Sequence, residues 1–299
     1  MMDRRLRRQI KDYIRSFVRP LNLMSVPEVL PLPPGQRVLV LSPHFDDDVL
    51  GCGGTLRKHV RAGHRVTVVY FTDGRQGDPS VADKALVGAM RKEEARRATG
   101  LLGIGDLVFL DEPETRLRPR AGLVRRVAEI VARTAPDVIY VPSFLESHVD
   151  HFEVNRILLQ VATRAALQCH VCAYEVWTPL LPNAVVEISD VVEEKRRAVE
   201  AYASQIRQVD YVGTILGLNR YRSMAVLNGR GYAEAFLLTQ APDYLALLRS
   251  LGVGRRRLLD RRYWALARRV RGFLRPGSGG GAAEATPGGS TASAEGVPR

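Results

Sequence analysis

The chain has 299 residues, of which 45% are hydrophobic and 25% are charged, a composition that excludes a fibrous or wholly disordered protein. No run approaches the roughly 18 uninterrupted apolar residues that a membrane-spanning helix needs. The basic N-terminus lacks the apolar stretch and the cleavage site of a signal peptide. We therefore expect a cytoplasmic protein.

The formal net charge of +12 is concentrated at the two ends of the chain. Residues 1–20 sum to +5 and residues 249–275 to +9, whereas residues 21–248 sum to −1. A protein that binds nucleic acid more often carries positive charge on its folded face, within a DNA or RNA motif. We therefore expect no nucleic-acid partner. The basic ends indicate contact with an anionic surface, or they simply keep the protein soluble.

Short apolar runs alternate with longer amphipathic segments along most of the chain. The predicted strands are 36–42, 65–74, 106–111, 137–143, 170–177 and 185–190. The predicted helices are 49–63, 83–103, 121–135, 152–168, 191–206 and 210–226. This alternation predicts right-handed crossovers, and hence an α/β fold in which helices cover both faces of a parallel sheet.

Composition divides the chain into four predicted parts. Residues 1–35 are a basic N-terminal segment, and residues 36–245 form a single α/β domain with helical additions at its C-terminal end. Residues 246–275 are predicted as an Arg-rich amphipathic helix suited to a membrane surface, or alternatively packed on the body or on a partner chain. Residues 276–299 contain twenty Gly, Ala, Pro, Ser or Thr in twenty-four and are expected to be disordered.

The three cysteines, Cys52, Cys169 and Cys172, are too few for a disulfide framework. Cys169 and Cys172 have the C-x-x-C spacing of redox and zinc sites, but no second half-site accompanies them and Cys172 falls in a predicted strand. We expect all three to be buried core residues in a reducing compartment.

Two polar clusters follow the first and fourth predicted strands, at the sheet edge where open parallel sheets bind ligands. They are residues 42–48 (SPHFDDD) and residues 146–151 (ESHVDH). Taken singly, the acids could be helix caps and first-turn acids, and the histidines could be ordinary loop residues. Taken together, three adjacent carboxylates that repel one another and face an imidazole-rich loop indicate a bound dication.

Two imidazoles and one carboxylate with an open position form the ligand set of a catalytic zinc site, whose bound water acts as hydroxide near neutral pH. His44 and Asp47 are three residues apart in one turn and can both point inward, and His151 can complete the set from the other loop. Asp46 then remains beside the bound water as general base. The same ligand types also suit iron and other divalent ions.

The glycines of Gly51–Gly54 suggest a competing interpretation as a dinucleotide-binding loop. The match is poor because the acidic turn at residues 46–48 occupies the place where a pyrophosphate would approach the helix N-terminus. We expect these glycines instead to let the first helix pack closely on the sheet.

The motifs P-H-F-D-D at residues 43–47 and H-V-D-H at residues 148–151 resemble the P-H-P-D-D and H-P-D-H motifs of PIG-L/LmbE-like deacetylases. The resemblance covers most of residues 36–240, with Phe45 and Val149 where the family usually has proline. It implies a Rossmann-like, mostly parallel sheet. It also implies hydrolysis of an N-acetyl group, generally on an N-acetylglucosamine unit attached to inositol, malate, a lipid or another carrier.

The resemblance also implies roles for individual residues. It assigns three zinc ligands: His44, Asp47 and His151. Asp46 would be the general base, and His148 would stabilise the oxyanion or protonate the leaving amine. Asp150 would orient His148 from behind.

Arg91 and Asp111 are candidates for the sugar pocket, because sugar hydroxyls need charged or polar partners. The alternative for Arg91 is a scaffold role in which it pairs with Glu94 or Glu112. Asp48 is a third acid to which neither the residues nor the resemblance gives a role.

The leading hypothesis is a zinc-dependent N-deacetylase of an N-acetylated amino sugar. The basic ends suit a lipid-linked substrate and peripheral contact with an anionic membrane, at its inner face. One alternative is a metal-dependent hydrolase of a non-sugar amide, and another is a catalytically silent binding protein at a membrane surface. The carboxylate of Asp46 beside the expected metal argues against the silent protein.

Overall fold

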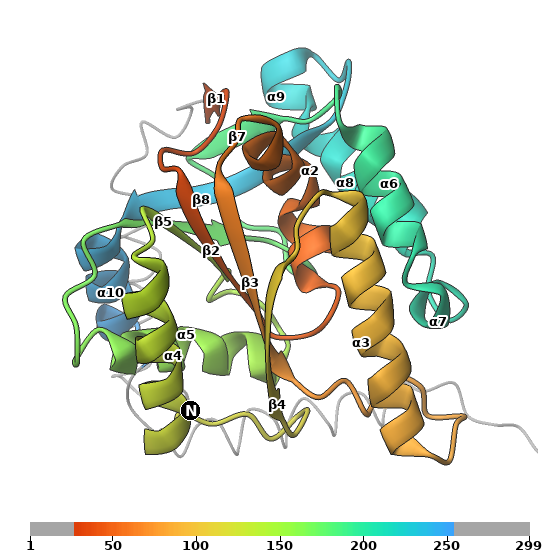
Figure 1. The fold of residues 1–299 in the computed structure, drawn as a ribbon. Helices are drawn as coiled ribbons and strands as arrows, with labels where there is room; N and C mark the ends of the chain where they lie inside the picture. Colours follow the sequence, from red (N-terminus) through yellow and green to blue (C-terminus); the bar gives the residue numbers. More distant parts are fainter. Residues whose placement is uncertain (1–26, 254–299) are drawn as a thin grey trace, which may run out of the picture. The chain divides into compact units, whose positions relative to one another are not determined.

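The computed structural model describes residues 27–253, which lie within one compact unit. Residues 1–26 of the predicted basic N-terminal segment, residues 254–275 of the predicted Arg-rich helix and the whole predicted tail lie outside the described residues. The described part is an eight-stranded sheet with helices packed on both faces (Figure 1). The α/β fold with a mostly parallel sheet is thus confirmed.

The strands are β1 (Glu28–Leu30), β2 (Arg37–Ser42), β3 (Arg65–Thr72), β4 (Asp106–Glu112), β5 (Val138–Pro142), β6 (His170–Tyr174), β7 (Ala184–Glu187) and β8 (Ala233–Gln240). The helices are α2 (Asp47–Arg61), α3 (Lys84–Leu101), α4 (Ala121–Thr134), α5 (Val149–Val161), α6 (Val192–Glu200), α7 (Ala203–Ile206), α8 (Tyr211–Arg222), α9 (Met224–Leu227) and α10 (Ala241–Ser250).

The strand order is β1-β7-β8-β6-β5-β2-β3-β4, and every pairing is parallel except those of β8 with β6 and β7. The sequence pattern predicts neither β8 nor the three-residue β1. Glu234 of β8 lies beneath α2 and accepts hydrogen bonds from the amides of Gly54 and Thr55.

The helix boundaries differ from the prediction at several points. The predicted helix 210–226 is two helices, α8 and α9, separated by Ser223. α5 ends at Val161 instead of residue 168, and a short run of turns follows it at residues 162–165. The predicted helix 191–206 is two helices, α6 and α7, separated by Tyr202, whose φ of −81° and ψ of 57° are not helical. α10 begins with a proline in its first turn and was not predicted.

Consecutive residues of the central strands face two separate cores, as the pleat of a strand requires. In β2, Val38 and Val40 contribute to the first core, while Leu39 and Leu41 contribute to the second. Helices α2, α3, α6 and α8 close the first core, and α4, α5 and α10 close the second (Figure 1). The near-continuous apolar runs of the sequence are explained by this burial on both faces.

All three cysteines are free and buried, as predicted. Cys52 and Cys172 lie in the first core and Cys169 in the second. Within residues 27–253, none of the helices combines the length and the apolar character needed to span a bilayer.

Candidate functional site

The candidate site is formed by two segments that follow neighbouring strands. Residues 43–48 continue from β2 and residues 143–151 continue from β5, and the two strands pair in parallel. The chain leaves β2 toward β3 on one side and reaches β5 on the other, so their carboxyl ends form a topological switch point. Ligands bind at this position in open α/β sheets. The two predicted polar clusters therefore meet.

Three side-chain atoms converge at this edge. Asp47 Oδ2 lies 2.9 Å from His44 Nδ1 and 3.1 Å from His151 Nε2, and the two ring nitrogens are 3.3 Å apart. Ligand atoms about 2 Å from a tetrahedral zinc ion are separated by about 3.3 Å. The three atoms thus have the spacing of one face of a zinc coordination shell, and they belong to the residues predicted as ligands.

His148 borders the same group. One ring nitrogen from each of His44, His148 and His151 lies within 4.8 Å of the others. The His148 side chain is one-third exposed, its ring meets that of His44 edge to face with centroids 4.5 Å apart, and its Nδ1 accepts a hydrogen bond from the Asp150 amide at the start of α5. His148 therefore stands on the solvent side of the buried atoms, as a further metal ligand or as a group that faces substrate.

Burial and charge act against each other on these groups. Burial alone would lower the pKa of His44, but the carboxylates of Asp47 and Asp150 raise that pKa well above its usual value. Burial alone would raise the pKa of Asp47, but His151 and His44 lower it well below its usual value. Asp47 is therefore an anion beside two imidazoles, which is the charge state of a metal-ligating carboxylate.

Asp150 has a different main partner from the one that the resemblance implies. Its carboxylate lies 3.4 Å from His44 Nε2 but 4.0 Å from His148 Nδ1. The carboxylate also accepts hydrogen bonds from the backbone amides of Thr115 (2.7 Å) and Leu117 (3.3 Å). Asp150 thus fixes the ring of His44, whose other nitrogen faces Asp47, in the manner of a carboxylate behind a metal-ligating histidine.

Asp46 occupies the N-cap position of α2, yet its side chain makes no capping hydrogen bond. Its Oδ2 instead accepts a hydrogen bond of 3.2 Å from Arg91 Nη2, and both side chains are almost fully buried. Burial raises the pKa of Asp46 in spite of Arg91, which lowers it. The interpretation of Asp46 as a simple helix cap is therefore wrong, and its carboxylate is held beside the three converging atoms.

Arg91 lies at the site instead of in a scaffold pair with Glu94 or Glu112. Glu94 accepts hydrogen bonds from the backbone and the hydroxyl of Ser204, at 2.8 and 2.6 Å, while Glu112 pairs with Arg120. The second anion near Arg91 is Glu114, 4.0 Å away.

Glu114 was not predicted. It is nearly buried, its Oε1 lies 3.9 Å from His44 Nε2, and its Oε2 accepts a hydrogen bond from the Gln76 amide. The next residue, Thr115, has a φ of 65°, a left-handed conformation that is strained for a β-branched side chain. The Thr115 amide is bonded to Asp150, so this strain is maintained by a contact of the site itself. The position just after β4, at the same sheet edge, could have indicated Glu114.

Asp48 and Asp111 lie apart from the converging atoms. Burial raises the pKa of Asp48 to about 8, and its Oδ2 accepts a hydrogen bond from the Tyr70 hydroxyl. Asp48 is thus mostly neutral near pH 7, which relieves part of the repulsion among the three adjacent acids. The half-exposed carboxylate of Asp111 pairs with Lys92 at 2.6 Å. Among the contacts of residues 27–253, none joins Asp111 to the cluster.

Glu146 supports His151 from behind. Its carboxylate accepts hydrogen bonds from the backbone amides of residues 176–178, the shortest being 2.7 Å from Val176, and its Oε2 lies 3.6 Å from His151 Nδ1. His151 Nδ1 is buried without a hydrogen-bond partner within the described part of the chain. Glu146 is therefore the group that can set the tautomer of His151 once that ring binds a cation.

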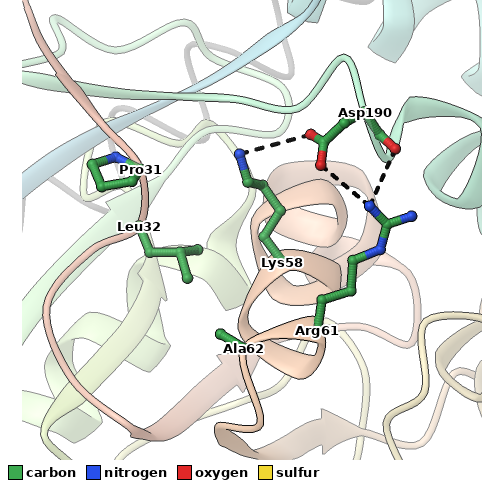
Figure 2. Close-up of a pocket in the computed structure, with 6 residues that line it drawn as sticks. All are labelled: Pro31, Leu32, Lys58, Arg61, Ala62 and Asp190. Carbon is green, nitrogen blue, oxygen red and sulfur yellow. Dashed lines mark hydrogen bonds and ion pairs between the residues drawn. The ribbon is translucent and has the colours of Figure 1, made fainter.

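A surface hollow near the C-terminal end of α2 is lined by other kinds of side chain than the candidate site (Figure 2). It is lined by Pro31, Leu32, Lys58, Arg61, Ala62 and Asp190. The Asp190 carboxylate lies 3.7 Å from Lys58 Nζ and 3.2 Å from Arg61 Nη1, so both cations already face an anion. The lining residues include no imidazole, and this hollow lacks the ligand chemistry found at the carboxyl edge.

Comparison with known proteins finds similarity to deacetylases in sequence and the same fold in solved structures. Residues 39–162 match the family described as PIG-L, GlcNAc-PI de-N-acetylase. The chain is 28% identical over 188 residues to the diacetylchitobiose deacetylase of Thermococcus kodakarensis, covering 57% of this chain and 70% of that protein. It is 28% identical over 205 residues to the 2'-N-acetylparomamine deacetylase of Streptomyces fradiae, covering 56% and 73%. The structure of the N,N'-diacetylchitobiose deacetylase from Pyrococcus horikoshii has the same fold, with a TM-score of 0.63 and 23% identity over 82% of this chain and 96% of that one.

Proposed function

From the PIG-L family domain that the chain carries in residues 39–162, we propose that the protein is a zinc-dependent hydrolase that removes the N-acetyl group from an N-acetylglucosamine-type amino sugar. The observation that carries the proposal is the convergence of His44 Nδ1, Asp47 Oδ2 and His151 Nε2 within 3.3 Å of one another, beside the carboxylate of Asp46. The similarity to deacetylases of two different amino sugars supports the reaction class.

The donor set fits a divalent cation, because imidazoles and a carboxylate are ligands that zinc prefers. Since the pKa of His44 is raised in the metal-free protein, its ring would give up a proton when the ion binds. His44, Asp47 and His151 would hold the ion. When bound, it supplies Lewis acidity, which polarises an amide carbonyl and makes water more acidic.

Asp46 would accept the proton of the attacking water. A general base is most effective when its pKa lies near the working pH, and burial raises the pKa of Asp46 in that direction. The hydrogen bond from Arg91 fixes the carboxylate without protonating it. The water oxygen bonds to the acetyl carbon, the carbon–nitrogen bond breaks, and acetate and a free amine leave.

His148 would act on the substrate side. The leaving nitrogen must gain a proton and the carbonyl oxygen gains negative charge, so the reaction needs a donor that is open to solvent and substrate. His148 is the member of the histidine cluster whose side chain is one-third exposed, while that of His44 is only 8% exposed and that of His151 is fully buried. Burial and the neighbouring His44 lower the pKa of His148 to about 4, so its ring is neutral near pH 7 and, with Nδ1 accepting from the Asp150 amide, can donate through Nε2–H. This supports oxyanion stabilisation, and protonation of the amine is the alternative role.

Arg91 and Glu114 are our candidates for contact with sugar hydroxyls, since both carry charge at the edge of the cluster. Asp111 remains a candidate only because sugar hydroxyls need polar partners, since its carboxylate pairs with Lys92. An Arg91→Met variant should raise KM and lower kcat together, because Arg91 also holds Asp46. An Asp111→Asn variant that loses activity would bring that residue into the pocket.

The basic ends of the chain support a lipid-linked substrate and peripheral contact with an anionic membrane at its cytoplasmic face. Cosedimentation of the full chain with phosphatidylserine vesicles at low salt, and its loss at high salt, would support this part of the proposal. Failure to sediment at low salt would refute it.

The deacetylase proposal is tested by free-amine release from a panel of soluble and lipid-linked N-acetylglucosamine compounds and simple acylamides. The zinc-loaded wild type is expected to act on the amino sugars, and Asp46→Asn should reduce the rate by about 10²- to 10⁴-fold, the contribution of a general base. Asp137→Asn, at the opposite edge of the sheet, is the matched control. A preference for simple acylamides would favour the non-sugar amidohydrolase, and no release from any compound would contradict the proposed substrate class.

A further inference from the structure

Besides the Arg91–Asp46 pair of the site, another ion pair is completely buried beneath α2. Lys195 of α6 and Glu234 of β8 have no solvent exposure, and Lys195 Nζ lies 2.6 Å from Glu234 Oε1. The proposed chemistry uses neither residue. Removing two charges from water carries a desolvation penalty that their attraction often fails to exceed, so a buried ion pair is weak evidence for stability alone. The contacts of this pair point to another role.

The pair lies at a break in α2. Cys52 has a φ of −143° and a ψ of 15°, which interrupts helical geometry between a first turn that starts at Asp47 and a second segment that ends at Arg61. An interruption of this kind removes the regular partners of nearby amides and carbonyls, and buried backbone groups need replacements.

Lys195 and Glu234 supply these partners from either side of the break. In an unbroken helix the Gly54 amide would donate to the Leu50 carbonyl. Here the Gly54 amide donates to Glu234 Oε1 at 2.9 Å, and the Leu50 carbonyl accepts from Lys195 Nζ at 2.9 Å. The amide and the hydroxyl of Thr55 also donate to Glu234, at 2.7 and 2.6 Å. The ion pair thus joins the two segments of α2 through its own 2.6 Å contact.

Further contacts fix the direction of the first turn. Lys195 Nζ is held by Asn219 Oδ1 of α8 at 2.9 Å. Gly51 lies so close to β6 that an added Cβ would stand 2.3 Å from Tyr174 Cδ2, and an added Cβ at Gly54 would stand 2.8 Å from Ile188. The first turn of α2 therefore packs against the carboxyl end of β6, and the break at Cys52 separates it from the second segment (Figure 1).

We propose that the buried Lys195–Glu234 pair is a positioning device for the site: it fixes the break in α2 and thereby sets the place of Asp47 and Asp46, which start that helix. This inference rests on the proposed metal site. Lys195 and Glu234 act through the backbone of α2 and do not touch the substrate.

The test measures zinc affinity by chelator competition on the full chain, together with kcat, KM and thermal stability. The main variant is Lys195→Met/Glu234→Gln, which removes both charges and leaves no uncompensated ion in the core. Val127→Ala is the control, because Val127 lies fully buried in the second core, away from α2, and its truncation lowers stability without reaching the site. Thr55→Val is a milder variant that removes one hydrogen bond to Glu234 and keeps the ion pair.

We expect zinc affinity to fall by about 10- to 100-fold in the double variant, the range found when partners that orient metal ligands are lost. The value of kcat should fall while KM changes little, and Thr55→Val should show a smaller loss of affinity in the same direction. Val127→Ala should bind zinc as the wild type does.

A double variant that folds and binds zinc with wild-type affinity would overturn the inference, as would equal losses in Val127→Ala. If the double variant does not fold, Thr55→Val decides: unchanged affinity overturns the inference and reduced affinity supports it. Because zinc affinity is measured without substrate, a wild type that binds zinc but releases no amine would refute the proposed function and leave this inference standing.

Discussion

The charged side chains at the two edges of the sheet differ in how far they are exposed to solvent. At the amino edge, Arg37 and Asp137 pair at 2.5 Å with side chains that are 52% and 34% exposed. Asp137 also accepts the backbone amides of residues 36 and 37, so it serves to join β2 to the start of β5. At the carboxyl edge, His44, Asp47 and His151 crowd together with side chains that are at most 8% exposed.

This difference in exposure distinguishes an ion pair that only joins two strands from a group of side chains that we propose to bind a ligand. In an exposed ion pair the two charges neutralise each other without a further ligand, and the pair contributes little to the free energy of unfolding. Two imidazoles and a carboxylate oxygen lie about 3 Å apart in a buried site, and the cation that we propose would complete this group.

The largest effect is expected from the ligand residues. Asp47→Ala should weaken zinc binding by more than the roughly 10- to 100-fold that the loss of an orienting partner produces. His148→Ala should retain zinc but lose activity by about 10²- to 10⁴-fold, because we place His148 on the substrate side. Chelator competition and amine release measure the two quantities. The reverse pattern would show that the three histidines, and not Asp47, hold the ion.

Glu146→Gln should weaken zinc binding by about 10- to 100-fold, since the variant loses the charge that can orient His151 Nδ1. Glu129→Gln, the same change at an exposed residue of α4 that pairs with Arg125, is the control. Zinc affinity equal to that of the wild type in Glu146→Gln would show that His151 is oriented by packing alone.

Stability should depend on pH through His59, a buried histidine of α2 bonded to the Tyr140 hydroxyl. Burial lowers the pKa of His59 to about 3, whereas the imidazole of an unfolded chain has a pKa of about 6.5. The unfolded chain therefore binds the proton first, and stability falls as the pH drops from about 6.5 toward 3, by at most about 1.4 kcal/mol per pH unit for one proton. Urea unfolding of His59→Gln should show a shallower decline, and parallel pH curves for the two proteins would contradict this.

The smallest effect is expected at the amino edge. The hydrogen bond from Arg37 lowers the pKa of Asp137 to about 2, so the stabilisation by Asp137 is complete above about pH 4 and is lost as the pH falls through 2. Arg37→Ala should cost about 1 kcal/mol or less at pH 7, because the pair is exposed. A loss of several kcal/mol, measured by urea unfolding, would mean that this edge is also a buried site.

Local sequence features predicted strands β2 to β7 and the two polar clusters that meet at their carboxyl edge. Buried β-branched runs such as residues 37–42 are strongly periodic, and their carboxyl ends must share one edge. The antiparallel β8 was not predicted, because its place is decided by pairing with β7 and β6, whose partner residues lie 46 to 70 positions away in the sequence.

Contacts between distant elements decided the other differences. The partner of Arg91 is set by the approach of α3 to the first turn of α2, so the nearby acids Glu94 and Glu112 were misleading candidates. The pairing of Lys195 with Glu234 spans 39 residues and leaves no local pattern. Asp48 had no predicted role, because its neutral state follows from burial, which sequence spacing does not reveal.

The most direct test of the account is the dependence of amine release on metal. The protein is stripped with a chelator, returned to buffer, and assayed on an N-acetylglucosamine compound as zinc is added, with Asp47→Ala alongside. We predict that activity is absent after stripping, returns at one zinc ion per chain, and fails to return in Asp47→Ala at the same zinc concentration. Full activity in the stripped protein, or recovery in Asp47→Ala equal to that of the wild type, would contradict a metal-dependent site at the carboxyl edge.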